Sequence, residues 1–306
     1  MEYFTLSDNT KIPVIGFGPG SMGYVPNKRP EKKKNIFLRA YNKFIGRRLN
    51  NRLVRKNYVN AVTSAITNGF RLIDFSAAYG DGRLISEAIK FSGVKREDLI
   101  LTTRVSNGAQ FNDRVEEEFF SQLKNFNTDY VDILMFHWPV TDLYTKTWLK
   151  MLKLRDKGYC KILGVANCHA HHLNELEKIS GVLPLIDQFE VSPLFTQKEL
   201  INFCQSKNIQ VESYTPLARF DDRLMRLPVL KKIADKYSRT VTQIILRWHV
   251  QNGLIPVVRT LSSTHQQEDL NIFGFELTRE ELAAIDAINI NARVRYDPDN
   301  CDFRIL

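Results

Sequence analysis

The 306-residue sequence predicts an α/β fold, a closed (β/α)8 barrel, from two observations. Short runs of apolar and β-branched residues alternate with longer segments of helical spacing, which is typical of parallel strands joined by helical crossovers. Eight such units in about 250 residues match the size of a closed barrel, and most of the runs end in a polar residue. The predicted strands are 12–18, 71–76, 99–105, 131–137, 161–167, 185–190, 209–214 and 255–260.

Four segments between these strands carry their apolar residues at helical spacing, so we predict a helix in each. We treat residues 1–306 as a single barrel domain. The apolar positions are Val115, Phe119, Leu123 and Phe126 in the first helix, Trp148, Leu149, Leu152 and Leu154 in the second, Leu200, Phe203 and Cys204 in the third, and the run 241–250 in the fourth.

Composition narrows the class of protein. The hydrophobic content is 43%, which is enough for a globular core. The first residues lack the pattern of a secretory signal, and no window has the apolar length of a membrane helix, so we expect a cytoplasmic protein. Four scattered cysteines without CxxC spacing predict neither a metal site nor a disulfide framework.

Polar residues stand at the ends of seven predicted strands. In a parallel barrel the carboxyl ends of all strands lie on one rim, where active sites form. The sequence therefore predicts that these side chains converge on one mouth. They are Asp74, Arg104, His137, Asn167, Gln188, Tyr214 and Arg259.

A glycine motif follows the first strand but does not predict a dinucleotide-binding sheet. Gly18, Gly20 and Gly23 satisfy G-x-G-x-x-G. That fingerprint needs a helix at its third glycine and an acidic residue about twenty positions later, whereas here "YVPNKRP" and a basic region follow. We expect the glycines to let the backbone approach a ligand at the barrel mouth.

Asp74 points to acid–base chemistry. A carboxylate in a crowded rim is partly desolvated and needs a cationic partner, for which Arg104 on the next strand is the candidate. Tyr79 follows in a short loop, and His137 ends the strand beyond. A phenol beside a cation and an imidazole is expected to release its proton more readily than at its ordinary pKa of about 10. We therefore predict that Tyr79 is a general acid.

The sequence resembles the aldo-keto reductase family over nearly its whole length apart from about 24–57. The motifs include "GFRLIDFSAAYG", "DILMFHWP", "KILGVANCHAHHLNEL", "ESYTPLA" and the closing "RYDPDN". The resemblance implies a (β/α)8 barrel with an N-terminal β-hairpin that binds a nicotinamide dinucleotide without a Rossmann domain.

The resemblance also implies roles for the rim residues in NADPH-dependent reduction of an aldehyde or ketone. Tyr79 would protonate the carbonyl oxygen, Asp74 would support the proton network, and His137 would orient the carbonyl. Asn167 and Gln188 would hold the carboxamide of the nicotinamide. Tyr214 would stack on its ring, and Gly18, Thr215 and Leu217 complete the cofactor-binding residues implied there.

The adenosine end of the cofactor is implied by "IPVVRTLSSTHQQEDL". By similarity to the family's phosphate-binding segment, Arg259 and Thr260 take the lysine and serine positions and His265 takes the arginine position. Glu268 and Asp269 take the pair that meets the adenosine. The bidentate donors of Arg259 suit a 2′-phosphate, so NADPH is favoured over NADH.

Two residues depart from the family pattern. Arg104 stands where the family has its catalytic lysine, and Ala166 stands where a serine usually precedes the carboxamide-binding asparagine. Arginine keeps the charge but is bulkier and cannot give up its proton. We therefore expect a slowed or specialised reductase. The alternative is a non-catalytic or weakly active nicotinamide-binding regulatory or scaffold protein.

A basic insertion at about 24–57 supplies the whole excess charge. Residues 28–56 hold twelve Lys or Arg and one acid, whereas the protein as a whole carries +9. The spacing predicts an amphipathic helix or helical pair at the active-site rim. The open interpretations are a lid, a site for an anionic substrate, and docking to an anionic membrane or acidic partner; no nucleic-acid module accompanies it. Its apolar positions are Phe37, Leu38, Tyr41, Phe44, Ile45, Leu49 and Leu53.

Overall fold

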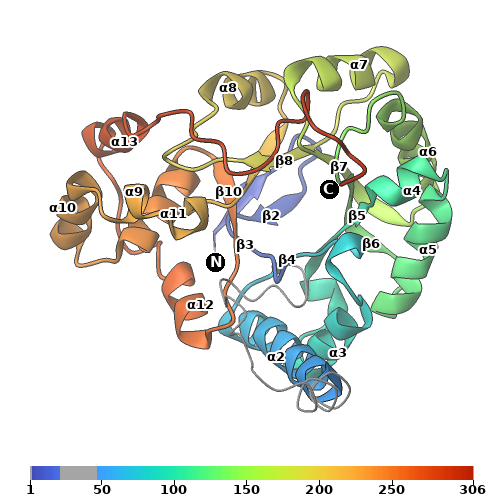
Figure 1. The fold of residues 1–306 in the computed structure, drawn as a ribbon, viewed down its shortest axis with the longest axis horizontal. Helices are drawn as coiled ribbons and strands as arrows, with labels where there is room; N and C mark the ends of the chain where they lie inside the picture. The colour runs from blue at the N-terminus through green and yellow to red at the C-terminus, as the bar shows by residue number, and fades with distance from the viewer. Residues whose placement is uncertain (1, 21–46, 306) are drawn as a thin grey trace, which may run out of the picture.

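The computed structural model describes residues 2–20 and 47–305, with side chains from residue 52 onward in the second range. Eight parallel strands close into a barrel in the order β10-β3-β4-β5-β6-β7-β8-β9. Helices surround this barrel (Figure 1). The predicted fold class, a (β/α)8 barrel with an N-terminal hairpin, is confirmed.

The strands follow the predicted runs closely, except for the first. The run 12–18 is divided, because its first residues pair antiparallel with β1 whereas only Gly16 and Phe17 join the barrel. The hairpin strands are β1 (Tyr3–Thr5) and β2 (Lys11–Pro13). The barrel strands are β3 (Gly16–Phe17), β4 (Leu72–Asp74), β5 (Ile100–Val105), β6 (Val131–Phe136), β7 (Cys160–Ala166), β8 (Ile186–Glu190), β9 (Gln210–Tyr214) and β10 (Leu254–Val258).

All four predicted helices are present. The helices are α2 (Arg47–Asn68), α3 (Arg83–Ser92), α4 (Asn107–Phe111), α5 (Val115–Phe126), α6 (Tyr144–Asp156), α7 (Ala170–Ser180), α8 (Lys198–Ser206), α9 (Asp222–Met225), α10 (Pro228–Tyr237), α11 (Val241–Gln251), α12 (Ser263–Leu270) and α13 (Arg279–Asp286). Local sequence explains several boundaries: Thr240 and Gln243 form a capping box at the start of α11, and Asn127 ends α5 in the left-handed conformation.

The predicted apolar faces are largely buried. All four apolar positions of α5 are buried, and so are Trp148 and Leu154 of α6. The prediction for Leu149 is wrong, since 42% of that residue is exposed. It follows Trp148 directly, and a helix turns by about 100° per residue, which takes Leu149 off the face that packs on the barrel.

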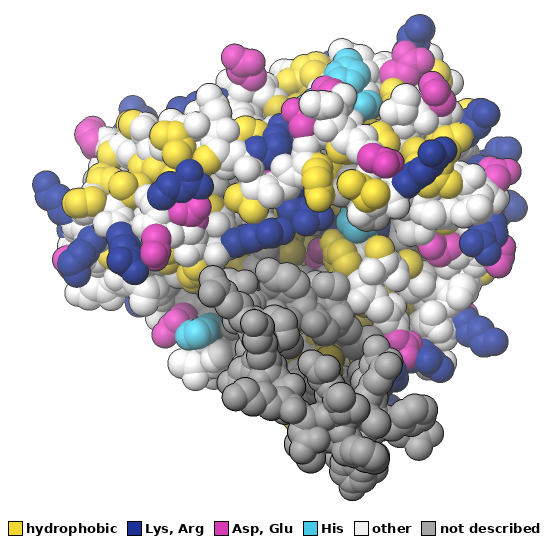
Figure 2. Space-filling view, in the orientation of Figure 1, with side chains coloured by type: hydrophobic (Ala, Val, Ile, Leu, Met, Phe, Trp, Pro, Cys, Tyr) yellow, Lys and Arg dark blue, Asp and Glu magenta, His cyan; other side chains and the backbone are white. Residues whose placement is uncertain are grey.

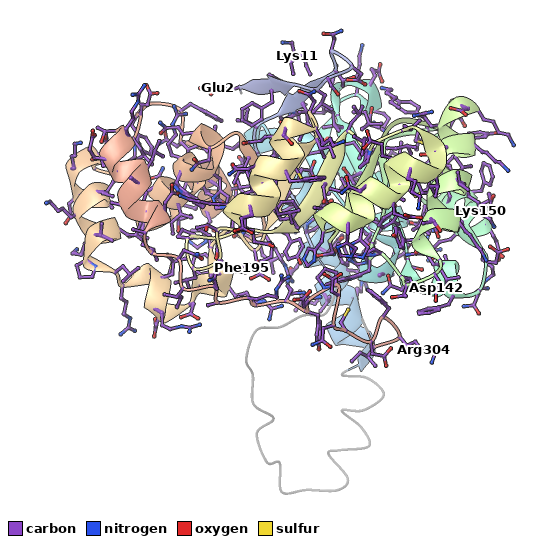
Figure 3. The ribbon with its side chains drawn as sticks, turned by 90° about the horizontal axis from the view of Figure 1, so that it is seen from above. Glu2, Lys11, Asp142, Lys150, Phe195 and Arg304 are labelled. Carbon is purple, nitrogen blue, oxygen red and sulfur yellow. The ribbon has the colours of Figure 1, made fainter. Side chains whose placement is uncertain are left out.

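The amino end of the barrel is closed by the hairpin. Leu6 and Ile12 from the hairpin pack against the inward residues Leu72, Ile133 and Ile162 of the strands. Figure 3 shows Glu2 and Lys11 at this end and Arg304 at the opposite end. An apolar plug therefore excludes water from one end and leaves the other for chemistry.

The C-terminal segment, residues 287–305, runs across the carboxyl end of the barrel (Figure 1). The backbone N–H groups of Val294 and Arg295 donate to the two carboxylate oxygens of Glu190, each at 2.7 Å. Further along, the ring of Phe303 lies 6.3 Å from that of Trp138, centroid to centroid. These contacts fasten the segment beside the strand ends.

Most of the predicted basic insertion lies outside the described residues. This includes Phe37, Leu38, Tyr41, Phe44 and Ile45, so its lid and docking interpretations stay predictions. The described part differs from the expectation. Helix α2 begins already at Arg47 and continues into the barrel-packed residues Tyr58 and Val59, and Leu53 is 56% exposed rather than packed.

Among the helices of the described ranges, none combines the length and the apolar character that crossing a bilayer requires.

Candidate active site

Four buried polar side chains from four strands form one hydrogen-bonded chain inside the carboxyl end of the barrel. The Nη2 atom of Arg104 lies 2.5 Å from Oδ1 of Asp74 and donates to Oε1 of Gln188 at 2.7 Å. Gln188 in turn donates through Nε2 to Oε2 of Glu212 at 2.8 Å. The predicted pairing of Asp74 with Arg104 is confirmed.

Burial affects the charges of Arg104 and Glu212 in this hydrogen-bonded network. The side chain of Arg104 is fully buried, which disfavours its charge, but the charges of Asp74, Tyr79 and Glu212 and the hydrogen bond to Asp74 together outweigh burial and raise the pKa of the guanidinium. Burial and, next, the neighbouring charge of Asp74 raise the pKa of Glu212 to about 7. One fixed cation therefore balances one carboxylate, and Glu212 holds a proton in mildly acidic solution.

Tyr79 and His137 lie next to each other, close to Arg104 of this hydrogen-bonded network. Tyr79 ends a short 3-10 turn, Ala77–Tyr79, in which the N–H of Ala78 donates to Oγ of the capping residue Ser76. The Tyr79 hydroxyl lies 3.5 Å from Nε2 of His137, with the two rings edge to face. The guanidinium carbon of Arg104 lies 6.0 Å from the centre of the Tyr79 ring. The sequence placed these residues on one rim, and the structure brings them together.

The protonation states differ in part from expectation. Burial raises the pKa of Tyr79 by more than Arg104 lowers it, so the expected fall in the pKa of this phenol is wrong for the structure as described. Burial and the charges of Arg104 and Arg295 lower the pKa of His137 to about 3. At neutral pH the site therefore presents a protonated phenol beside a neutral imidazole.

Asn167 connects His137 to Tyr214. It follows β7 in the left-handed conformation, with φ 62°. Its Nδ2 donates to the carbonyl oxygen of His137 at 2.9 Å, and its Oδ1 accepts from the Tyr214 hydroxyl at 2.6 Å. Two of the three residues predicted to meet the nicotinamide, Asn167 and Tyr214, thus lie within the same cluster as His137.

Gln188 lies deeper than its predicted role requires. Its amide oxygen and nitrogen are engaged by Arg104 and Glu212, and the residue is 3% exposed. Binding of the nicotinamide carboxamide by Gln188 stays a prediction. For this binding, the Gln188 side chain must give up its hydrogen bond to Arg104 or to Glu212.

The residues predicted for the adenosine end follow β10. Arg259 and Thr260 come directly after the strand, and His265 lies exposed in the first turn of α12. The backbone N–H of His265 donates to Oγ of Ser262, which caps the helix. The side chain of Arg259 lies over Gly20, where an added Cβ would stand 3.0 Å from its Nε. The partial positive charge at this helix N-terminus, beside an arginine, suits a phosphate group.

The acidic pair in α12 is not uniformly accessible. Glu268 is half-buried, whereas Asp269 is only 6% exposed. Burial, with a contribution from the charge of Glu268, raises the pKa of Asp269 to about 7. Glu268 is therefore the more accessible of the two for contact with a ligand.

Two further observations fit a bound dinucleotide. At Gly18 an added Cβ would lie 2.9 Å from Val257 and 3.4 Å from Oδ2 of Asp74, so only glycine fits where the backbone meets the site. Thr215, in the left-handed conformation after β9, has a buried Oγ1 atom with no hydrogen-bond partner among the described residues. The neighbouring Leu217 is 9% exposed.

Sequence reasoning missed three residues near the site. Glu212 had a signal, because it is a charged residue inside the predicted strand 209–214. Tyr58 comes from α2 and is 4% exposed; burial raises the pKa of its phenol, and the charges of Arg259 and Asp74 act on it. Arg295 comes from the C-terminal segment, where periodicity gives no information.

The four cysteines are all free, in agreement with the prediction of no disulfide framework; three are buried, and Cys301 is partly exposed.

Together these features indicate a class of protein, a barrel enzyme. A parallel barrel holds a phenol, a neutral imidazole and a buried arginine–aspartate pair at its carboxyl end, the end at which barrel enzymes have their active sites.

The family model described as "Aldo/keto reductase family" matches residues 45–290. The chain therefore belongs to the aldo/keto reductase family of oxidoreductases. An uncharacterized oxidoreductase, YtbE, of Bacillus subtilis is 40% identical over 80% of this chain and 88% of its own. The glyoxal reductase of Bacillus subtilis is 37% identical over 79% of this chain and 87% of its own.

Solved structures agree with this assignment. An aldo/keto reductase from Brucella melitensis has a TM-score of 0.80 at 32% identity, covering 94% of this chain and 99% of its own. An aldo-keto reductase of Bombyx mori in complex with NADP has a TM-score of 0.80 at 29% identity, covering 97% and 96% of the two chains. These likenesses support a nicotinamide cofactor.

Proposed function

We propose that this protein reduces a small aldehyde or ketone to an alcohol with NADPH, and that Tyr79 is the general acid. The observation that carries the proposal is the 3.5 Å distance between the Tyr79 hydroxyl and Nε2 of His137, with the guanidinium of the buried Asp74–Arg104 pair 6.0 Å from the Tyr79 ring. The relative named glyoxal reductase supports a reactive carbonyl as the substrate class.

When the cofactor is bound, it supplies a hydride to the carbonyl carbon. The protein's own residues hold and protonate the carbonyl oxygen. His137, neutral because of its lowered pKa, holds the carbonyl oxygen near the Tyr79 hydroxyl. Tyr79 transfers its proton to that oxygen as negative charge develops there. The positive charge of Arg104, whose guanidinium carbon lies 6.0 Å from the centre of the Tyr79 ring, stabilises the tyrosinate that results. The tyrosinate then recovers a proton from solvent.

Arg104 influences the proposed proton transfer through its charge alone. Since its pKa is raised further and it is bound to Asp74 and Gln188, it does not deliver a proton itself. It acts only through its charge, which opposes part of the rise that burial causes in the pKa of Tyr79. This is the physical basis for a slower or more specialised reductase.

The cofactor is NADPH rather than NADH in this proposal. Arg259 and Thr260 begin the loop that leads into α12, and His265 stands in that helix's first turn. A guanidinium beside an exposed helix N-terminus binds the additional 2′-phosphate through charge-assisted hydrogen bonds.

An anionic substrate fits the site better than a neutral one. Arg295 lies close enough to Tyr79 and His137 for its charge to lower the pKa of both groups. Within the described ranges its guanidinium forms no ion pair; its ring contact is with Tyr296, at 5.9 Å. Figure 2 shows Lys and Arg side chains across the middle of this face. A carboxylate or phosphate on the substrate would pair with Arg295.

The test of the reductase itself is NADPH consumption with a panel of reactive aldehydes and 2-oxoaldehydes, run beside calorimetric titration with NADPH. Turnover of at least one substrate together with cofactor binding is expected. Binding without turnover across the panel would reject the reductase and favour the regulatory or scaffold protein.

The test of substrate charge compares glyoxylate with glyoxal, which are similar in size and differ in charge. Arg295→Gln is expected to lower kcat/KM for glyoxylate by about tenfold or more, because a hydrogen bond to a charged group is lost. Glyoxal should be affected much less. Arg293→Gln is the matched control, since that side chain already pairs with Asp297. Equal losses for both substrates would contradict the assignment.

A further inference from the structure

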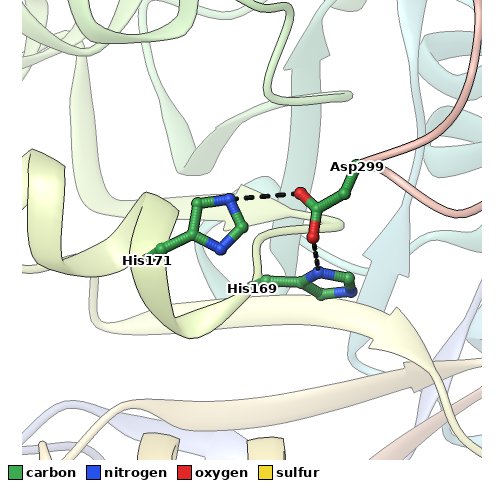
Figure 4. Close-up of side chains that lie close together, drawn as sticks. All are labelled: His169, His171 and Asp299. Atoms are coloured by element: carbon green, nitrogen blue, oxygen red, sulfur yellow. Dashed lines mark hydrogen bonds and ion pairs between the residues drawn. The ribbon is translucent and has the colours of Figure 1, made fainter.

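Two histidines and an aspartate form a cluster outside the catalytic residues (Figure 4). His169 caps the start of α7 and His171 lies in its first turn. Asp299 comes from the C-terminal segment, 130 residues after His169. Nδ1 of His169 lies 2.6 Å from one carboxylate oxygen of Asp299, and Nε2 of His171 lies 3.1 Å from the other.

The geometry of these atoms suits a metal ion. One potential ligand atom from each of the three residues lies within 4.8 Å of the others. Ligands at about 2.0–2.1 Å in a tetrahedral zinc site stand about 3.3 Å apart, so small side-chain movements suffice to coordinate an ion. Imidazole and carboxylate are both ligands that Zn²⁺ accepts. The cluster is also accessible, because 62% of the His171 side chain is exposed.

His172 supports the cluster from the protein side. Its Nδ1 accepts the backbone N–H of His169 at 3.0 Å, which holds the turn that presents the ligands. Its Nε2 lies 3.6 Å from Oδ1 of Asp299.

The cluster connects α7 with the C-terminal segment, and both of these elements are close in sequence to active-site residues. His169 follows Asn167 by two residues, and it lines the same hollow as Asn167 and Pro298, the neighbour of Asp299. The C-terminal segment that carries Asp299 also carries Arg295. An ion held between α7 and Asp299 would therefore fix this segment beside the barrel mouth.

We propose that His169, His171 and Asp299 bind a divalent transition-metal ion, with Zn²⁺ as the probe, and that the ion fastens the C-terminal segment to α7. Water completes the coordination at this exposed position. The site is structural rather than catalytic, and it does not depend on the proposed reductase activity.

The test is calorimetric titration of Zn²⁺ into tag-free, chelator-treated protein. Binding of one ion per chain is expected at neutral pH. Mg²⁺, which prefers oxygen ligands, should not bind there. His171→Ala and Asp299→Asn are each expected to weaken Zn²⁺ binding by at least about tenfold.

Asp302→Asn is the matched control, because it removes another exposed carboxylate from the same segment outside the cluster. His171 is mostly exposed, so His171→Ala tests the site even where another variant folds poorly. Hydrogen exchange supplies a second readout: Zn²⁺ should slow exchange in residues 292–305 of the unaltered protein and not of His171→Ala. Absence of Zn²⁺ binding, or binding unaffected by both cluster variants, would overturn the proposal.

Discussion

The two ends of the barrel are built from the same strands and have opposite chemistry. β4 contributes Leu72 to the apolar plug at the amino end and Asp74 to the buried polar chain at the carboxyl end. The hairpin covers the first end, whereas the C-terminal segment lies beside the second. The difference shows that one end stabilises the fold and the other places charges where chemistry is performed.

The largest expected effect on stability comes from breaking the buried pair at the carboxyl end. Arg104→Met leaves Asp74 without its cation in a buried position, and the free energy of unfolding should fall by about 3–5 kcal/mol. Chemical denaturation measures this. Adding Asp74→Asn should recover part of the loss, and a loss below about 1 kcal/mol in the single variant would contradict a buried charged pair.

A comparable change at the amino end should affect stability alone. Ile133→Ala removes a fully buried side chain from the apolar plug and should cost about 2–4 kcal/mol, since the cavity cannot collapse completely. KM for the carbonyl substrate should not change. Leu53→Ala, at a position 56% exposed, is the control and should cost less than about 0.5 kcal/mol. A marked rise in KM for Ile133→Ala would show that the two ends are coupled.

The raised pKa of Glu212 predicts a pH dependence of stability. Its pKa is about 7 in the folded protein against an ordinary 4.5, so the folded state holds this proton more tightly than the unfolded state. Stability should therefore fall as pH rises from about 4.5 to 7 and change no further above that. The contribution is about 3 kcal/mol.

Glu212→Gln isolates this contribution, because glutamine can still accept the hydrogen bond from Gln188 and does not titrate. Unfolding curves at several pH values should show a flatter profile for the variant than for the unaltered protein. Parallel profiles would mean that Glu212 ionises normally in the fold.

The smallest expected effect concerns cofactor choice. Arg259→Met should reduce the preference for NADPH over NADH by about tenfold, as a charge-assisted contact to the 2′-phosphate is lost. Separate titrations with the two cofactors measure this. Arg226→Met, at an exposed arginine paired with Asp222, is the control. An unchanged preference would place the phosphate elsewhere.

The rim residues could be predicted because strand ends are a local property of the sequence. A run of apolar residues that stops at Asp74 or His137 already indicates the edge of the sheet. The barrel then places all such edges together. The fold and most of the candidate site therefore followed from periodicity and from the family resemblance.

The remaining features depend on burial or on distant contacts, which local patterns do not contain. The pKa of Tyr79 rises because desolvation exceeds the effect of Arg104, a balance that needs the folded environment. Gln188 faces Arg104 and Glu212, although the sequence places it only on the rim. The pairing of His169 with Asp299 joins residues with no common periodicity.

The account depends most directly on Tyr79 as the group that protonates the carbonyl oxygen. The measurement is the turnover number of Tyr79→Phe beside its NADPH dissociation constant, with the unaltered protein assayed in parallel. We expect the turnover number to fall by about 10²–10⁴, with NADPH binding retained, because the ring remains and only the hydroxyl is lost. A variant that keeps its full turnover would contradict the account.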